Sequence, residues 1–238
     1  MSDEFLYRLY QATPRTWVTP TIVAINVAVW LLNVALGVPL LSPSGAELLA
    51  WGGNRLAETH LQPWRLFSAT VLHAGIIHLA FNMWALWDVG RLAERFYGNA
   101  QFLLIYLWSG LFGSLASLFF AGRTAVSVGA SGAIFGVVGA LLAAIFTKHS
   151  RLPAPLVKPV RNSLLTFVGF SLFLGFTSGV VDNAAHLGGL AAGFGLALIM
   201  AERFDWTLYR RQGLARAIIA MVVAAAIALT LWRWLAYR

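Results

Sequence analysis

The sequence predicts an all-α, polytopic membrane helical bundle, and three observations lead to this prediction. First, 59% of the 238 residues are hydrophobic and only 11% are charged, whereas an ordinary soluble domain is about 25% charged. Second, the hydrophobic residues gather in seven segments of roughly the length that crosses a bilayer as a helix. Third, glycines recur at four-residue spacing in two of these segments, which favours close helix packing in membranes. A soluble enzyme and a disordered chain are both excluded by this composition.

The seven expected spans cover residues 17–37, 71–89, 102–121, 131–146, 164–180, 184–201 and 217–232. The first is longer than the roughly 7–15 apolar residues of a signal peptide, so we interpret it as a span. The fourth is short for a full crossing, and we expect it to begin inside the membrane beside a wet or protein-walled cavity. Trp51 and Trp64 lie in the loop over residues 38–70, so we expect this loop to lie partly in the headgroup layer.

The excess of basic residues indicates how the chain is oriented. The formal net charge is +8, from 17 Lys and Arg against 9 Asp and Glu. If the N-terminus is inside, the inner segments hold 12 of the 17 basic residues and the outer segments hold 5. This asymmetry predicts an inner N-terminus and an outer C-terminus, and it leaves no reason to expect a nucleic-acid partner. The chain has no cysteine, which excludes disulfides, Cys-based metal sites and a thiol nucleophile.

The second expected span carries polar side chains at bilayer depth, where such groups are costly and point to function. His78 and Asn82 are four residues apart and share one face of a helix, and His73 lies nearer the outer end of the span. These side chains would also suit hydrogen bonding between helices. By themselves they do not separate packing from catalysis.

A serine stands among small residues at the start of the fourth span. Ser131 follows Gly129 and Ala130 and precedes Gly132. At a helix N-terminus, the unpaired N–H groups and the positive end of the helix dipole would stabilise an oxyanion formed at this serine. The alternative is packing alone, because Gly132 and Gly136 also form a GxxxG pair.

The sixth span begins with a histidine among small residues. Gly189 and Gly193 repeat the four-residue spacing, so we expect the fourth and sixth spans to pack closely. His186 is either part of that packing or a general base for a nearby nucleophile. Asp182 lies one turn earlier, at the loop, so the sequence does not place a carboxylate to orient this histidine.

The topology brings these residues to one depth of the membrane. Spans two, four and six all run from outside to inside, and a helix rises 1.5 Å per residue. The outer half of the bilayer therefore holds all four polar candidates: His78, Asn82, Ser131 and His186. Packing devices need not share a level, whereas a catalytic site must. The pattern predicts a dyad of Ser131 and His186, with Phe135, one turn after the serine, packed against the imidazole.

This arrangement resembles the rhomboid family of intramembrane serine proteases over nearly the whole chain. The motifs that carry the resemblance occur in order on the expected spans: Trp64-Arg65, His73 with His78 and Asn82, Gly129 to Gly132 around Ser131, and His186 with Gly189 and Gly193. The stretch from Glu94 through Gly98 to Ser109-Gly110 is also similar. Each motif is weak alone, and together they are specific.

The resemblance implies a role for each matched residue. Ser131 would be the nucleophile and His186 the general base and later acid. His78, Asn82 and the Ser131 amide would form the oxyanion hole. The supporting residues would be Phe135, His73, Trp64, Arg65, Gly129, Gly132, Gly189 and Gly193, with Trp64 and Arg65 anchoring the first loop.

The resemblance also implies the substrate and the cofactor requirement. The substrate would be a transmembrane segment of another protein, entering past the fifth span and cut near its outer end, and neither a cofactor nor a metal would be needed. Well-known members carry a tyrosine at the position of Phe135. A phenylalanine keeps the ring but loses the hydroxyl, and we expect activity to survive.

The resemblance divides the chain into three parts. Residues 1–16 would form a short cytoplasmic N-terminal segment, residues 17–201 the six-helix catalytic core, and residues 202–238 a cytoplasmic loop and a seventh transmembrane helix. We expect an integral protein of a bacterial inner membrane, with the active site toward the outer face. Its expected partners are the lipid bilayer and transmembrane proteins, and the sequence does not determine its oligomeric state.

Two other functions compete with the protease. One is a non-catalytic rhomboid-like binder of membrane helices. The other is a transporter, which would require polar groups through the full bilayer depth, whereas the inner halves of spans four and six are almost bare of them. Asp88 and Glu94 lie near the inner end of span two, where ionic pairing with Arg91 or Arg95 would account for them.

Overall fold

The structure is a computed structural model that describes residues 2–122, 124–147, 151–178 and 181–236. Arg123, Lys148 and Arg238, which enter the count of basic residues, and Val180, the expected end of the fifth span, lie outside these ranges. Within the described ranges the regular secondary structure is helical, apart from one isolated bridge between Asn54 and Ser127. The predicted all-α fold class is confirmed.

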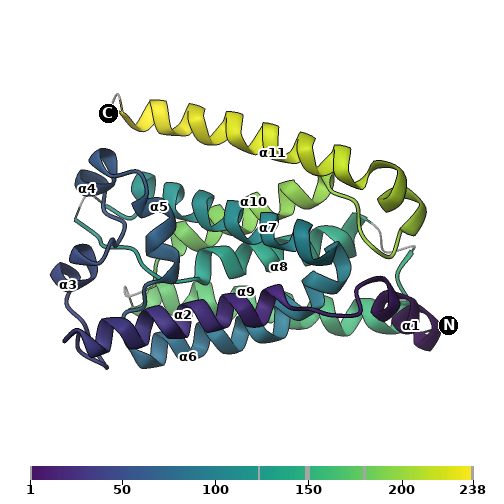
Figure 1. The fold of residues 1–238 in the computed structure, drawn as a ribbon, viewed down its shortest axis with the longest axis horizontal. Helices are drawn as coiled ribbons and strands as arrows, with labels where there is room; N and C mark the ends of the chain where they lie inside the picture. Colours follow the sequence, from purple (N-terminus) through teal and green to yellow (C-terminus); the bar gives the residue numbers. More distant parts are fainter. Residues whose placement is uncertain (1, 123, 148–150, 179–180, 237–238) are drawn as a thin grey trace.

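The helices are named in chain order as α1 (Ser2–Ala12), α2 (Val18–Ala35), α3 (Gly45–Ala50), α4 (Leu56–Leu61), α5 (Arg65–Ser68), the 3₁₀ turn η1 (Ala69–Val71), α6 (Ile76–Ala85), the π-helical turn η2 (Leu86–Gly90), α7 (Arg91–Phe120), α8 (Ser131–Thr147), α9 (Ala154–Ser178), α10 (Asn183–Ile199) and α11 (Trp206–Ala236). Figure 1 shows the long helices lying side by side, with α3, α4 and α5 at one end and α1 at the other. We call these ends the loop end and the N-terminal end.

Helices long and apolar enough to cross a membrane account for most of the bundle. Four such stretches occur in the described residues: Val18–Ala35, Ile76–Phe120, Ala154–Thr177 and Trp206–Leu235. The stretch Ile76–Phe120 consists of two helices, because helical geometry breaks at Gly98. The apolar helices α8 and α10 have 17 residues each, or about 26 Å at 1.5 Å per residue, slightly less than a hydrocarbon core of about 30 Å.

The sequence predicts a loop over residues 90–101 between the second and third spans, and this prediction is wrong. Instead, α6 continues through the π turn η2 into α7, and the chain leaves helical geometry only at Gly98, with φ 75° and ψ 161°. That backbone conformation suits glycine, which has no Cβ. Phe96 and Tyr97 are almost completely buried, so the helix is extended because its last turn belongs to the core.

The carboxylate of Glu94 is a second correction. The sequence predicts pairing with a neighbouring arginine in an inner loop, but Glu94 is fully buried. Its oxygens accept hydrogen bonds from the N–H groups of Val18 (2.8 Å) and Thr19 (2.9 Å) and from the Thr19 hydroxyl (2.7 Å). Glu94 therefore satisfies the unpaired N–H groups at the start of α2 and complements its dipole. Asp88, by contrast, is exposed.

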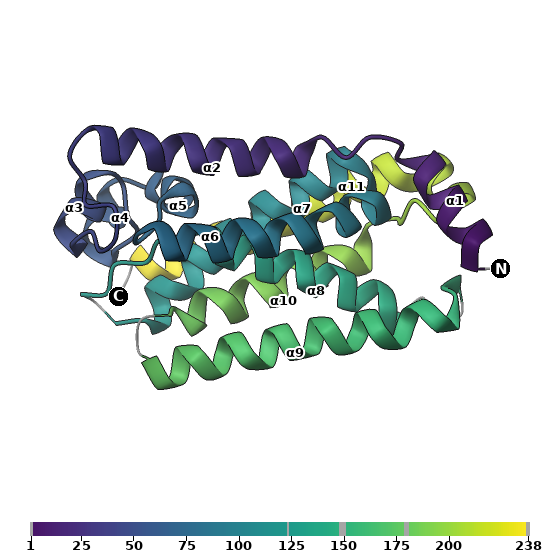
Figure 2. The ribbon, with the colours of Figure 1, turned by 90° about the horizontal axis from the view of Figure 1, so that it is seen from below.

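The centre of the bundle is α8. Fourteen of its seventeen residues are buried, and α7 and α10 pack against it. Figures 1 and 2 show α8 between its neighbours in both views, with α2 and α9 on opposite sides in the second view. A helix apolar on all sides, as α8 is, is stable only when surrounded. The first residue of α8 is therefore held in place by a deeply buried helix.

Candidate active site

Ser131 is the first residue of α8 and is half-buried. The chain reaches it through Gly129, whose φ of 121° is one that side-chain-bearing residues rarely adopt. The Gly129 N–H donates to the Ala69 carbonyl in η1 at 2.9 Å. Ser131 is thus held at the N-terminus of a buried helix, where the first N–H groups have no partner within the helix.

The imidazole of His186 lies flat against the ring of Phe135. The two ring centroids are 4.0 Å apart and the planes differ by 11°. Both side chains are buried, with exposed fractions of 4% for His186 and 1% for Phe135. Because Phe135 is four residues after Ser131, both lie on the same face of α8. The stack therefore brings the histidine of α10 to the serine face of α8.

The glycines of α8 and α10 bring the two helix backbones into contact. A Cβ on Gly189 would overlap the carbonyl oxygen of Gly132, and a Cβ on Gly193 would overlap that of Gly136. Close approach of this kind needs small residues on both helices. It sets the register of α10 against α8 and so holds His186, one turn before Gly189, at the level of Ser131 and Phe135.

His78 comes to the same place from α6. A Cβ built on Gly129 would lie 2.6 Å from Cε1 and 2.9 Å from Nε2 of this imidazole, so the ring rests on the backbone two residues before Ser131. Nδ1 of His78 accepts a hydrogen bond from the Ala74 N–H at 3.3 Å. A neutral imidazole that accepts at Nδ1 carries its proton on Nε2. His78 therefore presents a donor near Ser131.

Asn82 and His73 flank His78. Asn82 is buried, and its Nδ2 donates to the His78 carbonyl at 2.9 Å. The amide has a second N–H, which remains available as a donor. His73 is buried just before α6, with its ring edge-on to that of His78 at a centroid separation of 5.2 Å. The ring of His78 is thus confined between His73 and Gly129.

Asp182 caps α10. Its Oδ1 accepts a hydrogen bond from the Ala185 N–H at 2.9 Å. Within the part of the chain that the structure describes, Nδ1 of His186 has no hydrogen-bond partner. The stack with Phe135 is therefore a contact that orients His186. The described residues also contain no group of three or more His, Asp or Glu side chains that could hold a metal ion.

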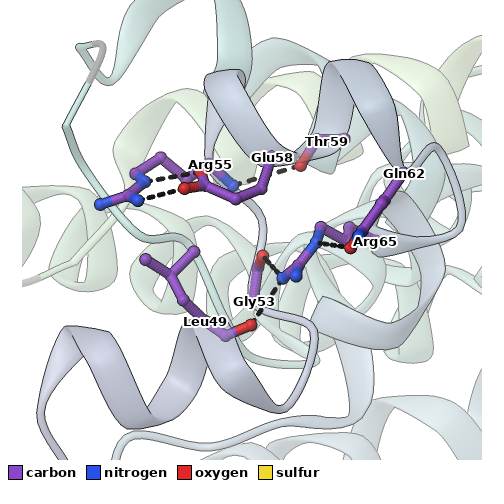
Figure 3. Close-up of polar contacts among 7 residues, drawn as sticks. All are labelled: Leu49, Gly53, Arg55, Glu58, Thr59, Gln62 and Arg65. Atoms are coloured by element: carbon purple, nitrogen blue, oxygen red, sulfur yellow. Dashed lines mark hydrogen bonds and ion pairs between the residues drawn. The ribbon is translucent and has the colours of Figure 1, made fainter.

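Arg65 ties together the short helices of the loop end (Figure 3). Its Nη1 donates to the carbonyls of Leu49 (2.7 Å) and Gly53 (3.0 Å), and its Nε donates to Oε1 of Gln62 (2.8 Å). Trp64 is half-exposed, and its ring edge lies 2.6 Å from where a Cβ of Gly52 would stand. Arg65 thus fixes the loop from inside, while part of Trp64 faces outward.

A second arginine of the loop end is paired with a carboxylate. Arg55 Nε donates to Glu58 Oε2 at 2.7 Å, and Arg55 Nη2 contacts the other carboxylate oxygen (Figure 3). This hydrogen bond lowers the pKa of Glu58 from 4.5 to about 2. The pair fastens the start of α4.

Sequence reasoning missed the contribution of α7 to the site. A Cβ added to Gly113 would stand 2.9 Å from the Ala185 carbonyl oxygen. Ser109 fills the space beside Gly136. These residues let α7, α8 and α10 meet directly behind the serine. The signal was present, because Ser109, Gly113 and Ser117 repeat a small residue every four positions on one face of α7.

The fold and this site define an integral membrane protein with a helical core. Residues 60–203 match the family model for the Rhomboid domain, and this range contains every candidate site residue. The chain belongs to the rhomboid family.

Several relatives agree with this assignment. Rhomboid protease GluP of Bacillus subtilis (strain 168) is 44% identical over 131 residues, which cover 55% of this chain and 25% of GluP. RHOMBOID-like protein 6, mitochondrial, of Arabidopsis thaliana is 33% identical over 229 residues, covering 82% of this chain and 73% of the relative. The putative rhomboid protease YdcA of Bacillus subtilis is 32% identical over 151 residues, covering 63% and 74%. The chain thus spans about a quarter of the length of GluP.

Proposed function

We propose that this protein is an intramembrane serine endopeptidase that cleaves transmembrane segments of other proteins near their outer ends. The observation that carries the proposal is the stack of His186 on Phe135, because it brings a base to the face of α8 that begins with Ser131. The names of two relatives, a rhomboid protease and a putative rhomboid protease, support the same class of activity.

The first half of the reaction forms an acyl-enzyme. The Ser131 hydroxyl oxygen attacks the carbonyl carbon of the scissile peptide bond, while an imidazole nitrogen of His186 takes the hydroxyl proton. The carbonyl oxygen becomes an oxyanion. His186 then gives the proton to the amide nitrogen of the leaving strand, the C–N bond breaks, and an ester to Ser131 remains.

The second half returns the enzyme to its starting state. His186 removes a proton from water, and the resulting hydroxide attacks the ester carbonyl. The second oxyanion collapses, the carboxyl product leaves, and the proton returns to the Ser131 oxygen. Because a buried base serves both halves, its ring must keep one orientation, and the flat contact with Phe135 supports that requirement.

The oxyanion would be stabilised by three donors. The backbone N–H of Ser131 lies at the positive end of α8, Nε2–H of His78 lies beside Gly129, and the free N–H of Asn82 lies one helical turn from His78. Such preorganised donors are worth about 3–4 kcal/mol each in other serine proteases. We assign the oxyanion hole to these groups.

We also propose how substrates approach. Of the four apolar stretches long enough to cross a membrane, α9 is the least buried, so a helix from the bilayer would reach the site by displacing α9 rather than α8.

The basic residues predict that the N-terminal end faces the cytoplasm of a bacterial cell and that the site faces outward. The chain has no cysteine, so single cysteines can be introduced at the exposed positions Ser44 and Thr207. Their labelling would show which end of the bundle faces outward. Only the first should react with a membrane-impermeant maleimide from outside.

The test of the chemistry is labelling of the purified protein by a fluorophosphonate probe. Wild type should be labelled and Ser131→Ala should not, and Ser131→Ala should fail to cleave a model transmembrane substrate. Ser127→Ala is the matched control, because Ser127 pairs with Asn54 through its backbone and should keep both labelling and cleavage. Full cleavage by a folded Ser131→Ala protein would reject the mechanism.

The same experiment separates the protease from a non-catalytic rhomboid relative. A binder of membrane helices would retain a model transmembrane segment in wild type and in Ser131→Ala alike, with no cleavage by either. The protease predicts that only the variant accumulates uncut substrate.

A further inference from the structure

A cavity of about 780 Å³ opens at the N-terminal end, far from Ser131. Three segments distant in sequence form it. They are α1, the residues that precede α9, and the connection from α10 into α11. Neither the catalytic proposal nor any of the family motifs uses these residues. Its size lies in the range of pockets that bind small molecules.

The cavity has a small net positive charge, because its three arginines outnumber the two carboxylates paired with them, and this charge favours an anion. Three arginines line it, one from each segment: Arg8, Arg151 and Arg203. Glu4 is its only lining carboxylate among the described residues. Glu4 pairs with Arg8 on the same helix. Arg151 contacts Asp205 across the connection. Guanidinium groups are suited to phosphate, because their planar donors match its oxygens.

The cavity lies beside the first residues of two long apolar helices. Pro153, on its wall, directly precedes the apolar stretch Ala154–Thr177, and Trp206, also on its wall, is the first residue of the stretch Trp206–Leu235. Tryptophan is enriched at the boundary between lipid and water, and arginine is enriched in the loops on the cytoplasmic side. The arginines therefore lie at the end of the bundle from which these two helices start.

An apolar extension continues from the cavity. A smaller cavity of about 120 Å³ shares Phe5 and Pro153 with it and is otherwise lined by Leu6, Pro155 and Leu156. These last residues include Pro155 and Leu156 in the first turn of α9, so the extension lies against the start of that helix. A site with arginines at one end and apolar walls at the other fits an amphiphile better than a free anion.

We propose that this cavity binds one anionic phospholipid of the adjacent membrane leaflet. The phosphate would lie among Arg8, Arg151 and Arg203, and the first carbons of an acyl chain would lie against Pro153 and Leu156. Basic pockets between helices are suited to such headgroups. The lipid would join α1 to the base of α9. This proposal does not depend on the proteolytic function.

The docking of α1 supports a fixed site rather than a loose surface. Phe5 of α1 packs on Phe204 with ring centroids 6.0 Å apart, and Phe204 packs on Phe96 of α7 at 5.4 Å. Arg95 lies over the ring of Tyr10 at 3.6 Å and donates to the Thr13 carbonyl at 2.7 Å. The wall that carries Arg8 is thus held to the core independently of any lipid.

The test is retention of lipid by the full-length protein in a non-ionic detergent, measured by native mass spectrometry. Phosphatidylglycerol should be retained with one lipid per chain and should outcompete phosphatidylcholine. The double variant Arg8→Gln/Arg151→Gln should weaken phosphatidylglycerol binding by up to about 30-fold, because each exposed ion pair with the phosphate contributes up to about fivefold. Both side chains are mostly exposed, so the variant should fold.

The matched control is Arg211→Gln at the same end of the bundle. Arg211 is exposed and does not line the cavity, so this single charge removal should leave phosphatidylglycerol retention within about twofold. Arg151→Gln alone should weaken retention by up to about fivefold. An Arg211→Gln effect equal to that of Arg151→Gln would overturn the proposal, since binding would then follow net charge and not the cavity.

A competition experiment distinguishes the lipid from a soluble phosphate. Glycerol phosphate or inorganic phosphate, at the concentration of the added lipid, should not displace phosphatidylglycerol, because neither fills the apolar extension. Displacement at equal concentration would assign the site to a soluble phosphate compound and reject the lipid. Equal retention of phosphatidylcholine and phosphatidylglycerol would reject an anion site altogether.

Discussion

The helices α8 and α9 are neighbours of opposite character. Fourteen of the seventeen residues of α8 are buried. In the most apolar 18-residue segment of α9, by contrast, only 11% of the residues are buried. Glycines of α8 contact the backbone of α10, while a Cβ added to Gly169 of α9 would have no described residue within 4 Å. Phe135 of α8 is almost wholly covered, and Phe170 of α9 is 61% exposed.

The contrast teaches how one bundle serves two demands. The proposed chemistry needs groups held within a fraction of an ångström, which the close-packed α8 provides. Admission of another helix needs an element that separates at small cost, and α9 has few contacts to lose. Apolar composition alone does not distinguish these helices. What separates them is whether the apolar side chains meet protein or lipid.

The largest expected effect comes from removing the ring of Phe135. Phe135→Ala should lower the free energy of unfolding by about 3 kcal/mol, because it leaves a cavity in the core. Cleavage should also fall about 100-fold, since His186 loses the surface that orients it. The measurements are thermal unfolding in detergent and the cleavage rate of a transmembrane substrate.

Two companions sharpen this prediction. Phe135→Tyr keeps the ring and should keep at least a third of the activity, while Phe135→Leu keeps apolar bulk without a flat ring and should lose activity more than stability. Phe170→Ala, on α9, should change the stability by less than about 0.5 kcal/mol. A loss of stability in Phe170→Ala equal to that in Phe135→Ala would contradict the comparison between the two helices.

Adding one methyl group to each helix is the next test. Gly139→Ala would place a Cβ onto the Leu190 carbonyl oxygen and 3.0 Å from the Phe194 backbone nitrogen, so α8 and α10 must separate. We expect destabilisation of about 2 kcal/mol. Gly169→Ala is the matched change in α9 and should be neutral or slightly stabilising, because it only improves helix propensity. Equal unfolding temperatures for the two variants would show that α8 is not packed as described.

The tie between α9 and α10 gives a smaller effect. Nδ2 of Asn183 donates to the Leu172 carbonyl at 3.1 Å, near the loop end of α9. Asn183→Ala removes a hydrogen bond worth about 1 kcal/mol, and we expect it to raise cleavage by up to about fivefold if separation of α9 limits the rate. Asn162→Ala, at the exposed opposite end of α9, is the control. Slower cleavage by a folded Asn183→Ala protein would count against entry past α9.

The smallest expected effect is a pH dependence at the loop end. Arg55 holds the pKa of Glu58 at about 2, below its ordinary value of 4.5. A lowered pKa means that the stabilisation is complete above pH 4.5 and is lost as the pH falls toward 2. Because the pair is partly exposed, we expect a contribution below about 1 kcal/mol. Unfolding temperatures of wild type and Glu58→Gln should differ at pH 6 and converge as the pH falls toward 2.

The sequence by itself determined the membrane class, the approximate spans and the candidate dyad. Long apolar segments leave few alternatives, because lipid requires every backbone group to be paired within a helix. In such surroundings His78, Asn82, Ser131 and His186 stand out as costly side chains at one depth. The family assignment follows from the same residues and agrees with the match over residues 60–203.

Only the tertiary structure decided where the helices end and which of their faces are covered. Glu94 is charged and was expected in a loop, but it caps α2 because the two segments meet in space. The break at Gly98 replaced an expected loop, because burial of Phe96 and Tyr97 outweighs the local signals for a turn. The difference between α8 and α9 is likewise absent from their compositions. It arises from long-range contacts, which a one-dimensional pattern of apolar residues does not specify.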